Sequence, residues 1–311
     1  VGGSARGLTP VRCRTGRVSR RYTHRMKRRA SVSWRRPAGR TRVAAQHRIL
    51  LAALTLAVLS SSVATAAGPQ PGSYDEAVTT FLTMTEGPDA ARLIATKLDE
   101  LATEVRDSGR PLREWFFESA RFRGMQLPPN EERVSIFRVL DRRRGPCLEL
   151  ASLYLGLAER LDVQATPVAT PRHVFVREAV DGEAVRNVEL LEGGRERPDR
   201  SYLAQEKAPP DDPRAASLLR PLDPPRFLAS LVNNYAVRVR AAGHLPQAES
   251  LYQRAIALDP DCQPCLYNYA NLLADTGKSR QALDLYDRAL ALHPWDRDAI
   301  RNRSRLGSTR D

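Results

Sequence analysis

The sequence predicts an α+β domain followed by an all-α repeat domain. Three observations lead to this fold class: helical periodicity of apolar residues from Tyr74 to about Arg144, strand-like segments between Val163 and Leu190, and a 34-residue repeat in the last third of the chain. A chain of 311 residues is long enough to bury a core in each domain.

A basic leader precedes both domains. Residues 1–48 contain fifteen Lys or Arg and no Asp or Glu, which leaves 34 of the 49 basic residues against 36 acidic ones in the rest of the chain. The rest is therefore near neutral, and the net charge of +13 for the whole chain does not indicate a surface that binds nucleic acid. We expect no nucleic-acid partner.

The leader runs into the apolar segment Ile49–Leu59 and then into small residues that include Ala64-Thr65-Ala66. A positive region, a short apolar core and an A-x-A site are the three parts of a secretory signal. We therefore expect residues 1–67 to be a leader with a signal at about 49–66, and the protein to be periplasmic or secreted. An uncleaved segment that anchors the chain in a membrane is the alternative, and Met26 is an alternative translation start.

The first domain, residues 73–194, is expected to begin with helices. Apolar residues recur at intervals of three and four from Asp75 onward and again from Ala90 to Val105. A further helix is expected to start near Asn130, whose side chain can cap it. A strongly apolar helix follows at residues 148–161.

Strand-like segments come next, at residues 163–169, 173–178 and 185–190. Helices followed by a hairpin sheet are typical of an α+β domain. Residues 195–226 contain seven prolines and no sustained periodicity, so we expect a Pro-rich linker there.

Residues 227–308 contain two copies of the 34-residue repeat and a polar third helix from about Trp295 to Arg305. The matching positions are Val232/Leu266, Tyr235/Tyr269, Ala236/Ala270, Gly243/Gly277, Ala248/Ala282, Tyr252/Tyr286, Ala255/Ala289 and Pro260/Pro294. Small residues where two helices touch, Gly at the turn and Pro at the end resemble the tetratricopeptide repeat, and the third helix suits a cap. The repeats are expected to bind a protein or peptide. His244 and His293 lie at turns or helix ends and are interpreted as surface residues.

Cys147 is the candidate nucleophile. It follows Gly145-Pro146 at the start of the apolar helix, where unpaired N–H groups and the positive end of the helix dipole stabilise a thiolate and offer donors to an oxyanion. A small buried residue without chemistry is the alternative. Cys262 and Cys265 have the spacing of a redox or metal pair, but no second pair or nearby His supports one, so packing or a local disulfide is preferred. No metal or cofactor is predicted.

His173 is the candidate base, and the turn at Asp181-Gly182 decides whether Glu189 can orient it. A two-residue turn pairs residues whose numbers sum to 363 and puts Glu189 on the face opposite His173. A bulge with Gly182 in the left-handed position gives a sum of 362 and puts Glu189 directly across from His173. Burial favours the second register, because the first pairs Val174 with a carboxylate. Taken alone, His173 and Glu189 are each more typical of ordinary structural residues.

Residues 145–161, 171–177 and 186–189 resemble the core of the transglutaminase-like superfamily, most closely its bacterial branch with tetratricopeptide repeats behind that core. The resemblance implies a papain-like fold, with Cys147 as nucleophile, His173 as base and Glu189 in the place of the usual acidic residue. Glu stands where Asp is commoner, so Asn187 is kept as the alternative residue that orients the ring. Arg172 and Asp162 replace glycines, and Asp162 can still adopt the left-handed conformation.

The expected function is that of an exported cysteine enzyme acting on an amide or ester bond, by hydrolysis or by acyl transfer, with repeats for protein binding. A catalytically inactive scaffold whose repeats mediate protein–protein interaction is the alternative. The run Arg142-Arg143-Arg144 before Cys147 either attracts an acidic substrate or is a solvated helix end.

Overall fold

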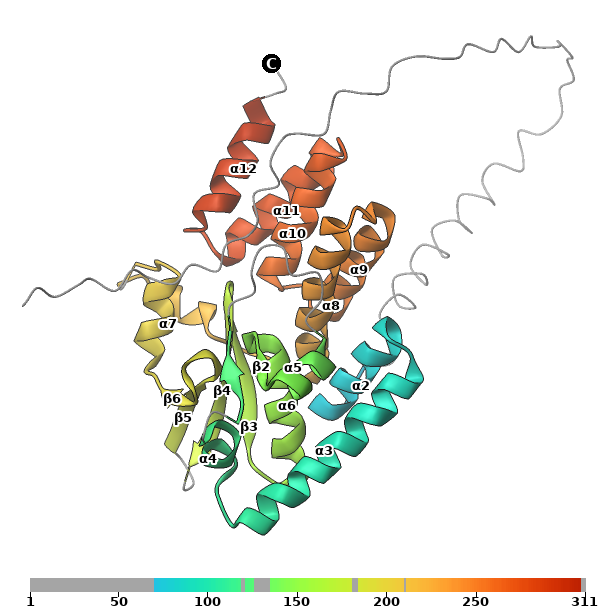
Figure 1. The fold of residues 1–311 in the computed structure, drawn as a ribbon. Coiled ribbons are helices and arrows are strands. Elements are labelled where there is room, and N and C mark those ends of the chain that lie inside the picture. Colours follow the sequence, from blue (N-terminus) through green and yellow to red (C-terminus); the bar gives the residue numbers. More distant parts are fainter. Residues whose placement is uncertain (1–69, 119–120, 126–134, 181–183, 210, 309–311) are drawn as a thin grey trace, which may run out of the picture. The chain divides into compact units, whose positions relative to one another are not determined.

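The computed structural model describes residues 70–118, 121–125, 135–180, 184–209 and 211–308. The predicted leader and signal, Asn130, and the turn residues Asp181 and Gly182 lie outside these ranges. Within them, helices and a small antiparallel sheet are followed by helices only, which confirms the predicted fold class (Figure 1). No helix in the described ranges is both long and apolar enough to cross a membrane.

The first domain opens with two helices at the predicted places, α2 (Tyr74–Thr85) and α3 (Pro88–Ser108), followed by the short α4 (Leu112–Phe117). The Ser73 hydroxyl caps α2 by accepting a hydrogen bond from the backbone N–H of Glu76. A stripe of buried residues along α3 faces the core; it consists of Ala91, Ile94, Leu98, Leu101, Ala102 and Val105.

The next helix, α5 (Ile136–Arg142), begins later than the predicted start near Asn130. Ser135 caps it by accepting a hydrogen bond from the backbone N–H of Arg138. Ser and Asn are about equally good caps, so their chemistry alone does not select between the two positions. Arg143 ends α5 in the left-handed conformation, with φ of 55°.

A two-stranded parallel ladder leads into the central helix. Strand β1 (Arg123–Gly124) pairs with β2 (Arg144–Gly145), and α6 (Cys147–Arg160) starts two residues after β2. Every residue of α6 from Leu148 to Ala158 is buried. Such a helix is covered on all sides, and it lies beside the main sheet in Figure 1. Asp162 follows it with φ of 55°, the left-handed conformation predicted for that position.

The main sheet has five strands in the order β6-β5-β4-β3-β7, and each neighbouring pair is antiparallel. The strands are β3 (Ala165–Thr170), β4 (His173–Val180), β5 (Ala184–Glu189), β6 (Arg195–Glu196) and β7 (Arg220–Pro221). The three longer strands lie at the predicted places.

Residues 195–226, predicted as a linker, belong instead to the folded domain. They contain β6, the helix α7 (Asp199–Gln205), the 3₁₀ turn η3 (Ala215–Leu218) and β7, so both edges of the sheet come from this segment. The prediction of a linker was wrong because these prolines stand at positions of helices and strands where a missing N–H is tolerated. Pro198 precedes α7, Pro221 lies in an edge strand, and Pro224 opens the next helix.

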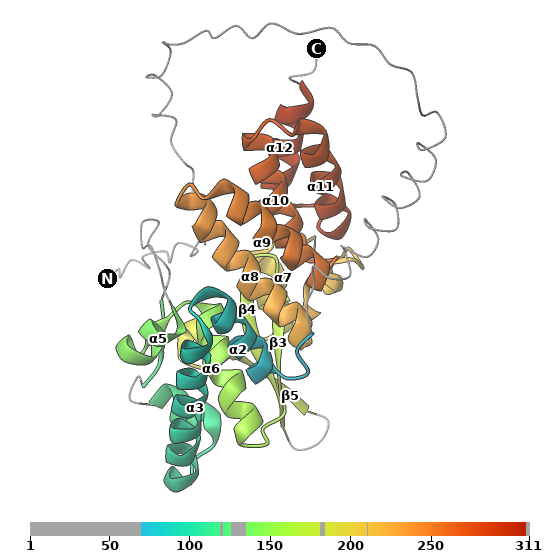
Figure 2. The same ribbon diagram turned by 90° about the vertical axis from the view of Figure 1, so that its right-hand side faces the viewer.

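The repeats form antiparallel helix pairs, as Figure 2 shows. The helices are α8 (Pro224–Ala241), α9 (Leu245–Leu258), α10 (Gln263–Asp275), α11 (Ser279–Leu292) and the capping helix α12 (Arg297–Gly307). Most of the matched small and aromatic positions are fully buried, including Ala236 and Ala270 at 0% exposure. Gly243 and Gly277 have φ of 87° and 81°, which explains glycine at both turns.

The predictions for the cysteines and histidines of the repeats had different outcomes. Cys262 and Cys265 form a local disulfide, one of the two preferred interpretations. His293, interpreted as a surface residue, is 0% exposed, and neither ring nitrogen has a hydrogen-bond partner. It is covered because residues of the first domain, Arg172 and Glu206, lie close to it. His244 is exposed, as predicted.

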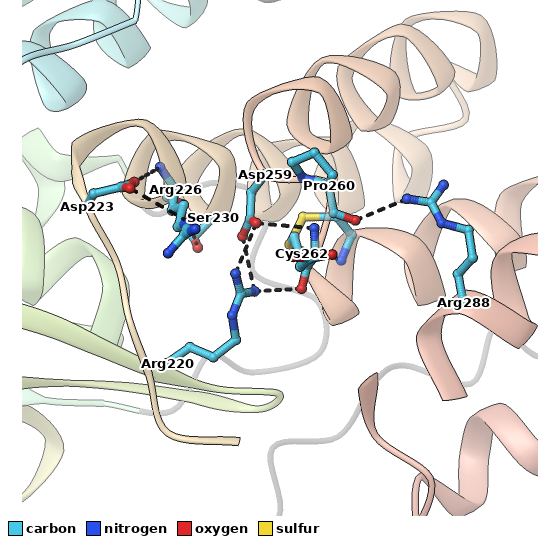
Figure 3. Close-up of polar contacts among 10 residues, drawn as sticks. Arg220, Asp223, Arg226, Ser230, Asp259, Pro260, Cys262 and Arg288 are labelled. Atoms are coloured by element: carbon cyan, nitrogen blue, oxygen red, sulfur yellow. Dashed lines mark hydrogen bonds and ion pairs between the residues drawn. A yellow bond between two sulfur atoms is a disulfide. The ribbon is translucent and has the colours of Figure 1, made fainter. Parts of the chain in front are cut away.

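The first repeat shares a core with the first domain. Buried residues of α8, such as Phe227 and Val232, belong to the same apolar cluster as α2, α3 and α6, and the Tyr74 and Phe227 rings meet edge to face at 5.8 Å. Figure 3 shows a second link, in which Arg220 of β7 contacts both carboxylate oxygens of Asp259 at 3.0 and 3.2 Å. Arg220 also donates to the carbonyl of Asp261 at 2.6 Å.

Candidate active site

Cys147 is the first residue of α6 and follows Pro146, which occupies the cap position without a capping side chain. The first helical hydrogen bond runs from the N–H of Leu150 to the carbonyl of Pro146, so the N–H groups before Leu150 have no partner within the helix. Cys147 is half-buried and is the free cysteine of the described part of the chain. A thiol in this position faces the donors and the positive dipole end that stabilise a thiolate.

His173 opens β4 and bridges two groups. Its Nε2 lies 2.8 Å from Oε2 and 3.0 Å from Oε1 of Glu189. A carboxylate accepts hydrogen bonds, so Nε2 carries a proton and donates it. The thiol of Cys147 lies close enough to the ring to raise the pKa of His173, and Nδ1 is the ring nitrogen that Glu189 does not occupy. The structure thus brings the three residues Cys147, His173 and Glu189 together.

The hairpin register that places Glu189 is neither of the two considered from the sequence. Paired residues of β4 and β5 sum to 364, as in Val176 with Val188, so the predicted sum of 362 is wrong by two. Continuing this register sets Glu189 two residues along from the position opposite His173. Both sums are even, and the side-chain period of a strand is two, so the two side chains still share a face.

Polar pairing explains the observed register. It sets Glu178 opposite Arg186 and Arg177 opposite Asn187, and the Arg177 Nε donates to the Asn187 side-chain oxygen at 2.8 Å. Apolar pairing is preserved, because Val176 and Val188 are both fully buried. The predicted register was chosen from the burial of the valines alone, without considering these polar pairs.

Asn187, the alternative residue to orient the ring, is engaged elsewhere. Besides the bond from Arg177, its amide nitrogen donates to the carbonyl of Arg197 at 2.9 Å and to Asp199 at 2.7 Å. It therefore joins β4 and β5 to the start of α7, and Glu189 holds the position next to His173.

The electrostatics of the site favour the protonated imidazolium form of His173. Burial alone would lower the pKa of His173, but its bonds to Cys147 and Glu189, and the charges of both, raise that pKa to about 10. Burial likewise opposes ionisation of Glu189, yet its bond to His173 lowers its pKa overall. Glu189 is 2% exposed and also accepts from the N–H of Leu191 at 2.9 Å, which fixes the carboxylate from a second side.

Two further residues support His173 that the sequence did not single out. Tyr202 of α7 is fully buried and stacks on Phe175 at 3.9 Å between ring centroids, and its ring lies 6.0 Å from that of His173. Glu206 is 1% exposed and bonds to the Thr170 hydroxyl and to Arg172, in the turn just before His173. Both lie in the segment predicted as a linker, so no signal pointed to them.

Comparisons with known proteins match two regions of the chain. A family model described as the transglutaminase-like superfamily matches residues 92–198, which include Cys147, His173 and Glu189, and a tetratricopeptide-repeat model matches residues 239–302. No curated protein and no solved structure matches the chain. Members of that superfamily are generally cysteine-based hydrolases or acyltransferases, and such repeats generally mediate protein–protein interaction. The chain thus joins a domain of the transglutaminase-like superfamily to tetratricopeptide repeats.

Proposed function

We propose that this chain is a cysteine enzyme that attacks an amide or ester carbonyl through Cys147, with His173 as the acid–base group and Glu189 as the residue that orients it. The observation that carries the proposal is the position of His173, which hydrogen-bonds a buried carboxylate and lies near the thiol of Cys147 at the start of α6. A buried His with a raised pKa beside a free thiol is the arrangement of an activated nucleophile.

The reaction would take two steps. The Cys147 thiolate attacks the carbonyl carbon, and N–H groups at the start of α6 are positioned to stabilise the resulting oxyanion. His173 then gives a proton to the departing amine or alcohol, which leaves a thioester on Cys147. In the second step His173 takes a proton from water or from an acceptor amine, the new oxygen or nitrogen attacks the thioester, and the thiol is released.

Hydrolysis is the preferred outcome, because water needs no binding site of its own. An amine acceptor would turn the same thioester into a transfer product. Mass spectrometry of the products with and without an added primary amine separates these two outcomes.

Export is a further part of the proposal. The basic leader and apolar segment of residues 1–67 support it. The Cys262–Cys265 disulfide is compatible with an oxidising compartment. Fractionation of cells that express the tagged chain tests this, since a cytoplasmic location would contradict it.

The alternative is an inactive scaffold whose repeats bind a partner. It is tested by replacing the nucleophile alone, with Cys147→Ser in the full chain. If cells keep the phenotype of the wild type, the scaffold is the better interpretation; loss of the phenotype with a stable, folded variant favours the enzyme.

The direct test of the site is the alkylation rate of Cys147 by iodoacetamide at neutral pH. His173→Ala should slow it at least about tenfold, because the variant loses the cation that stabilises the thiolate. His244→Ala, at an exposed histidine of the repeats, is the matched control and should leave the rate unchanged. Equal rates in all three proteins would contradict an activated pair.

A further inference from the structure

Two arginines of neighbouring strands lie opposite one another, just before the helix that begins with the candidate nucleophile. The parallel ladder of β1 and β2 pairs Arg123 with Arg144, and both are exposed. Like charges directly opposite one another on neighbouring strands repel. No ion pair joins either arginine to a carboxylate among the residues that the structure describes.

Arg143, between α5 and β2, is a third arginine with no ion pair among the described residues. Its side chain lies over the ring of Phe122, at 4.9 Å from the ring centroid. Its Nη1 is buried and lacks a hydrogen-bond partner. A buried donor on a charged group without an acceptor is destabilising, so three cations and one unused buried donor occur together.

Arg144 lies close to Cys147 along the chain. Only Gly145 and Pro146 separate the two residues. An extended residue advances about 3.3 Å, so their Cα atoms are at most about 10 Å apart. Arg123, which is paired with Arg144, therefore lies at the same end of α6 as Cys147.

We propose that Arg123, Arg143 and Arg144 form a carboxylate-binding subsite, so that the substrate is an acyl compound with a carboxylate near the attacked carbonyl. Guanidinium groups bind carboxylates through paired, charge-assisted hydrogen bonds, which would use the free donors of these arginines. This inference rests on the proposed function, since it names the substrate class of the same site.

The test compares two reagents for the same thiol, the anionic iodoacetate and the neutral iodoacetamide. The ratio of their alkylation rates at Cys147, measured by mass spectrometry on the full chain, reports the local charge, because the reactivity of the sulfur affects both rates alike. Arg123→Gln and Arg144→Gln should each lower the iodoacetate-to-iodoacetamide ratio about two- to fivefold, as expected for unit charges about 10 Å apart near a protein surface that salt at about 0.1 M screens. Arg143 is left intact because it also packs on Phe122.

Arg280→Gln, at an exposed arginine of α11, changes the net charge equally and should leave the ratio unchanged. A ratio that is the same in the wild type and in both subsite variants would overturn the proposal. The proposed function fails separately, if His173→Ala leaves the absolute rate with iodoacetamide unchanged.

Two competitors distinguish the source of the carboxylate. N-acetylglutamate α-amide carries it on a side chain, and N-acetylalanine carries it at a chain end. Slower alkylation with the first indicates an acidic side chain of the substrate, and slower alkylation with the second a terminal carboxylate. Either supports the subsite, whereas protection by neither competitor counts against it.

Discussion

At the scale of single residues, the length of the Glu189 side chain matters. The register places Glu189 diagonally from His173 instead of directly opposite it, and diagonal neighbours in a sheet have Cα atoms about 7–8 Å apart. Glu has one methylene more than Asp, the commoner residue at this place in the superfamily that the sequence resembles. The longer side chain reaches His173 at 2.8 Å and still accepts from Leu191.

Three substitutions at Glu189 distinguish the effect of its negative charge from the effect of its side-chain length. Glu189→Gln keeps an acceptor but loses the charge-assisted bond, so Cys147 alkylation should slow about tenfold. Glu189→Asp keeps the charge but is too short for the diagonal, and should slow the reaction by at least as much. Glu189→Ala should slow it about a hundredfold, within the range of positioned acid–base groups. Faster alkylation in Glu189→Asp than in Glu189→Gln would contradict the diagonal geometry.

The raised pKa of His173 also predicts how stability depends on pH. Its pKa is about 10 in the folded protein and 6.5 as the ordinary value. A raised folded-state pKa contributes stability that is fully present below pH 6.5 and lost as the pH rises toward about 10. Urea unfolding at several pH values should therefore show a steeper loss for the wild type than for His173→Gln. In Cys147→Ser the loss should end at a lower pH, because one of the two groups that raise the pKa of His173 is gone.

At the scale of elements, the short strand β1 helps to hold the carboxylate of Glu189 in place through the 3₁₀ turn η2 (Leu190–Glu192). Gly124 lies against the backbone of Leu191 in η2, and a Cβ on Gly124 would come 2.1 Å from the Leu191 Cα. The N–H of Leu191 holds Glu189. Strand β1 therefore fixes η2, and η2 fixes the carboxylate.

Gly124→Ala should therefore disturb the position of Glu189 and slow Cys147 alkylation, while elements far from β1 keep their structure. The added methyl cannot fit without moving η2, so Cys147 alkylation should slow and the unfolding free energy should fall by about 1–3 kcal/mol. Gly307→Ala is the control, since nothing lies within 4 Å of a Cβ there and Ala suits a helix better than Gly. An alkylation rate in Gly124→Ala equal to that of the wild type would show that η2 does not support Glu189.

Helices with a strong apolar periodicity could be predicted from the sequence, whereas the two-residue strands of the sheet could not. Helices α2, α3, α6 and the repeat pairs repeat their apolar residues often enough to be recognised, and Asp162 signalled its left-handed turn. Strands β6 and β7 have two residues each and gain their hydrogen bonds from partners elsewhere in the chain. A two-residue strand has no period to detect, so the segment that carries Tyr202 and Glu206 was taken for a linker.

The same limit explains the outcome for the site. The residue types and their shared strand face followed from the sequence, because face depends only on whether the register sum is odd or even. The value of the sum depends on side-chain pairs such as Glu178 with Arg186, and these were not weighed. The burial of His293 depends on the first domain meeting the last helices, which no local pattern encodes.

At the scale of the whole molecule, the two domains are joined by a buried ion pair as well as by a shared core. Glu149 lies in the first turn of α6, two residues after Cys147, and Arg238 of α8 contacts it at 3.3 Å. Burial raises the pKa of Glu149, and Arg238 opposes that shift. Removal of the repeats would expose the apolar core and deprive this carboxylate of Arg238, so a chain cut before α8 would lose stability as well as the repeats.

Arg238→Met should therefore destabilise the first domain, although the residue belongs to the repeats. Loss of the partner of a buried carboxylate destabilises by about 3 kcal/mol, the lower end of the usual range because Arg238 is partly exposed. The double variant Glu149→Gln, Arg238→Met should recover most of this. Arg226→Met in the same helix removes an exposed pair and should change the unfolding free energy by less than about 1 kcal/mol. Urea unfolding of all four proteins measures these differences.

The shared core also constrains how a chain of this design can lengthen. Helix α8 contributes buried residues to the core of the first domain, and Arg220 pairs with Asp259 at the end of α9. Displacing the first repeat would therefore expose that core to solvent. Helices α11 and α12 pack mainly on other repeat helices. We therefore expect added repeats to be tolerated better after α11 than within α8 and α9, provided that the residues around His293 keep their place near Arg172 and Glu206 of the first domain.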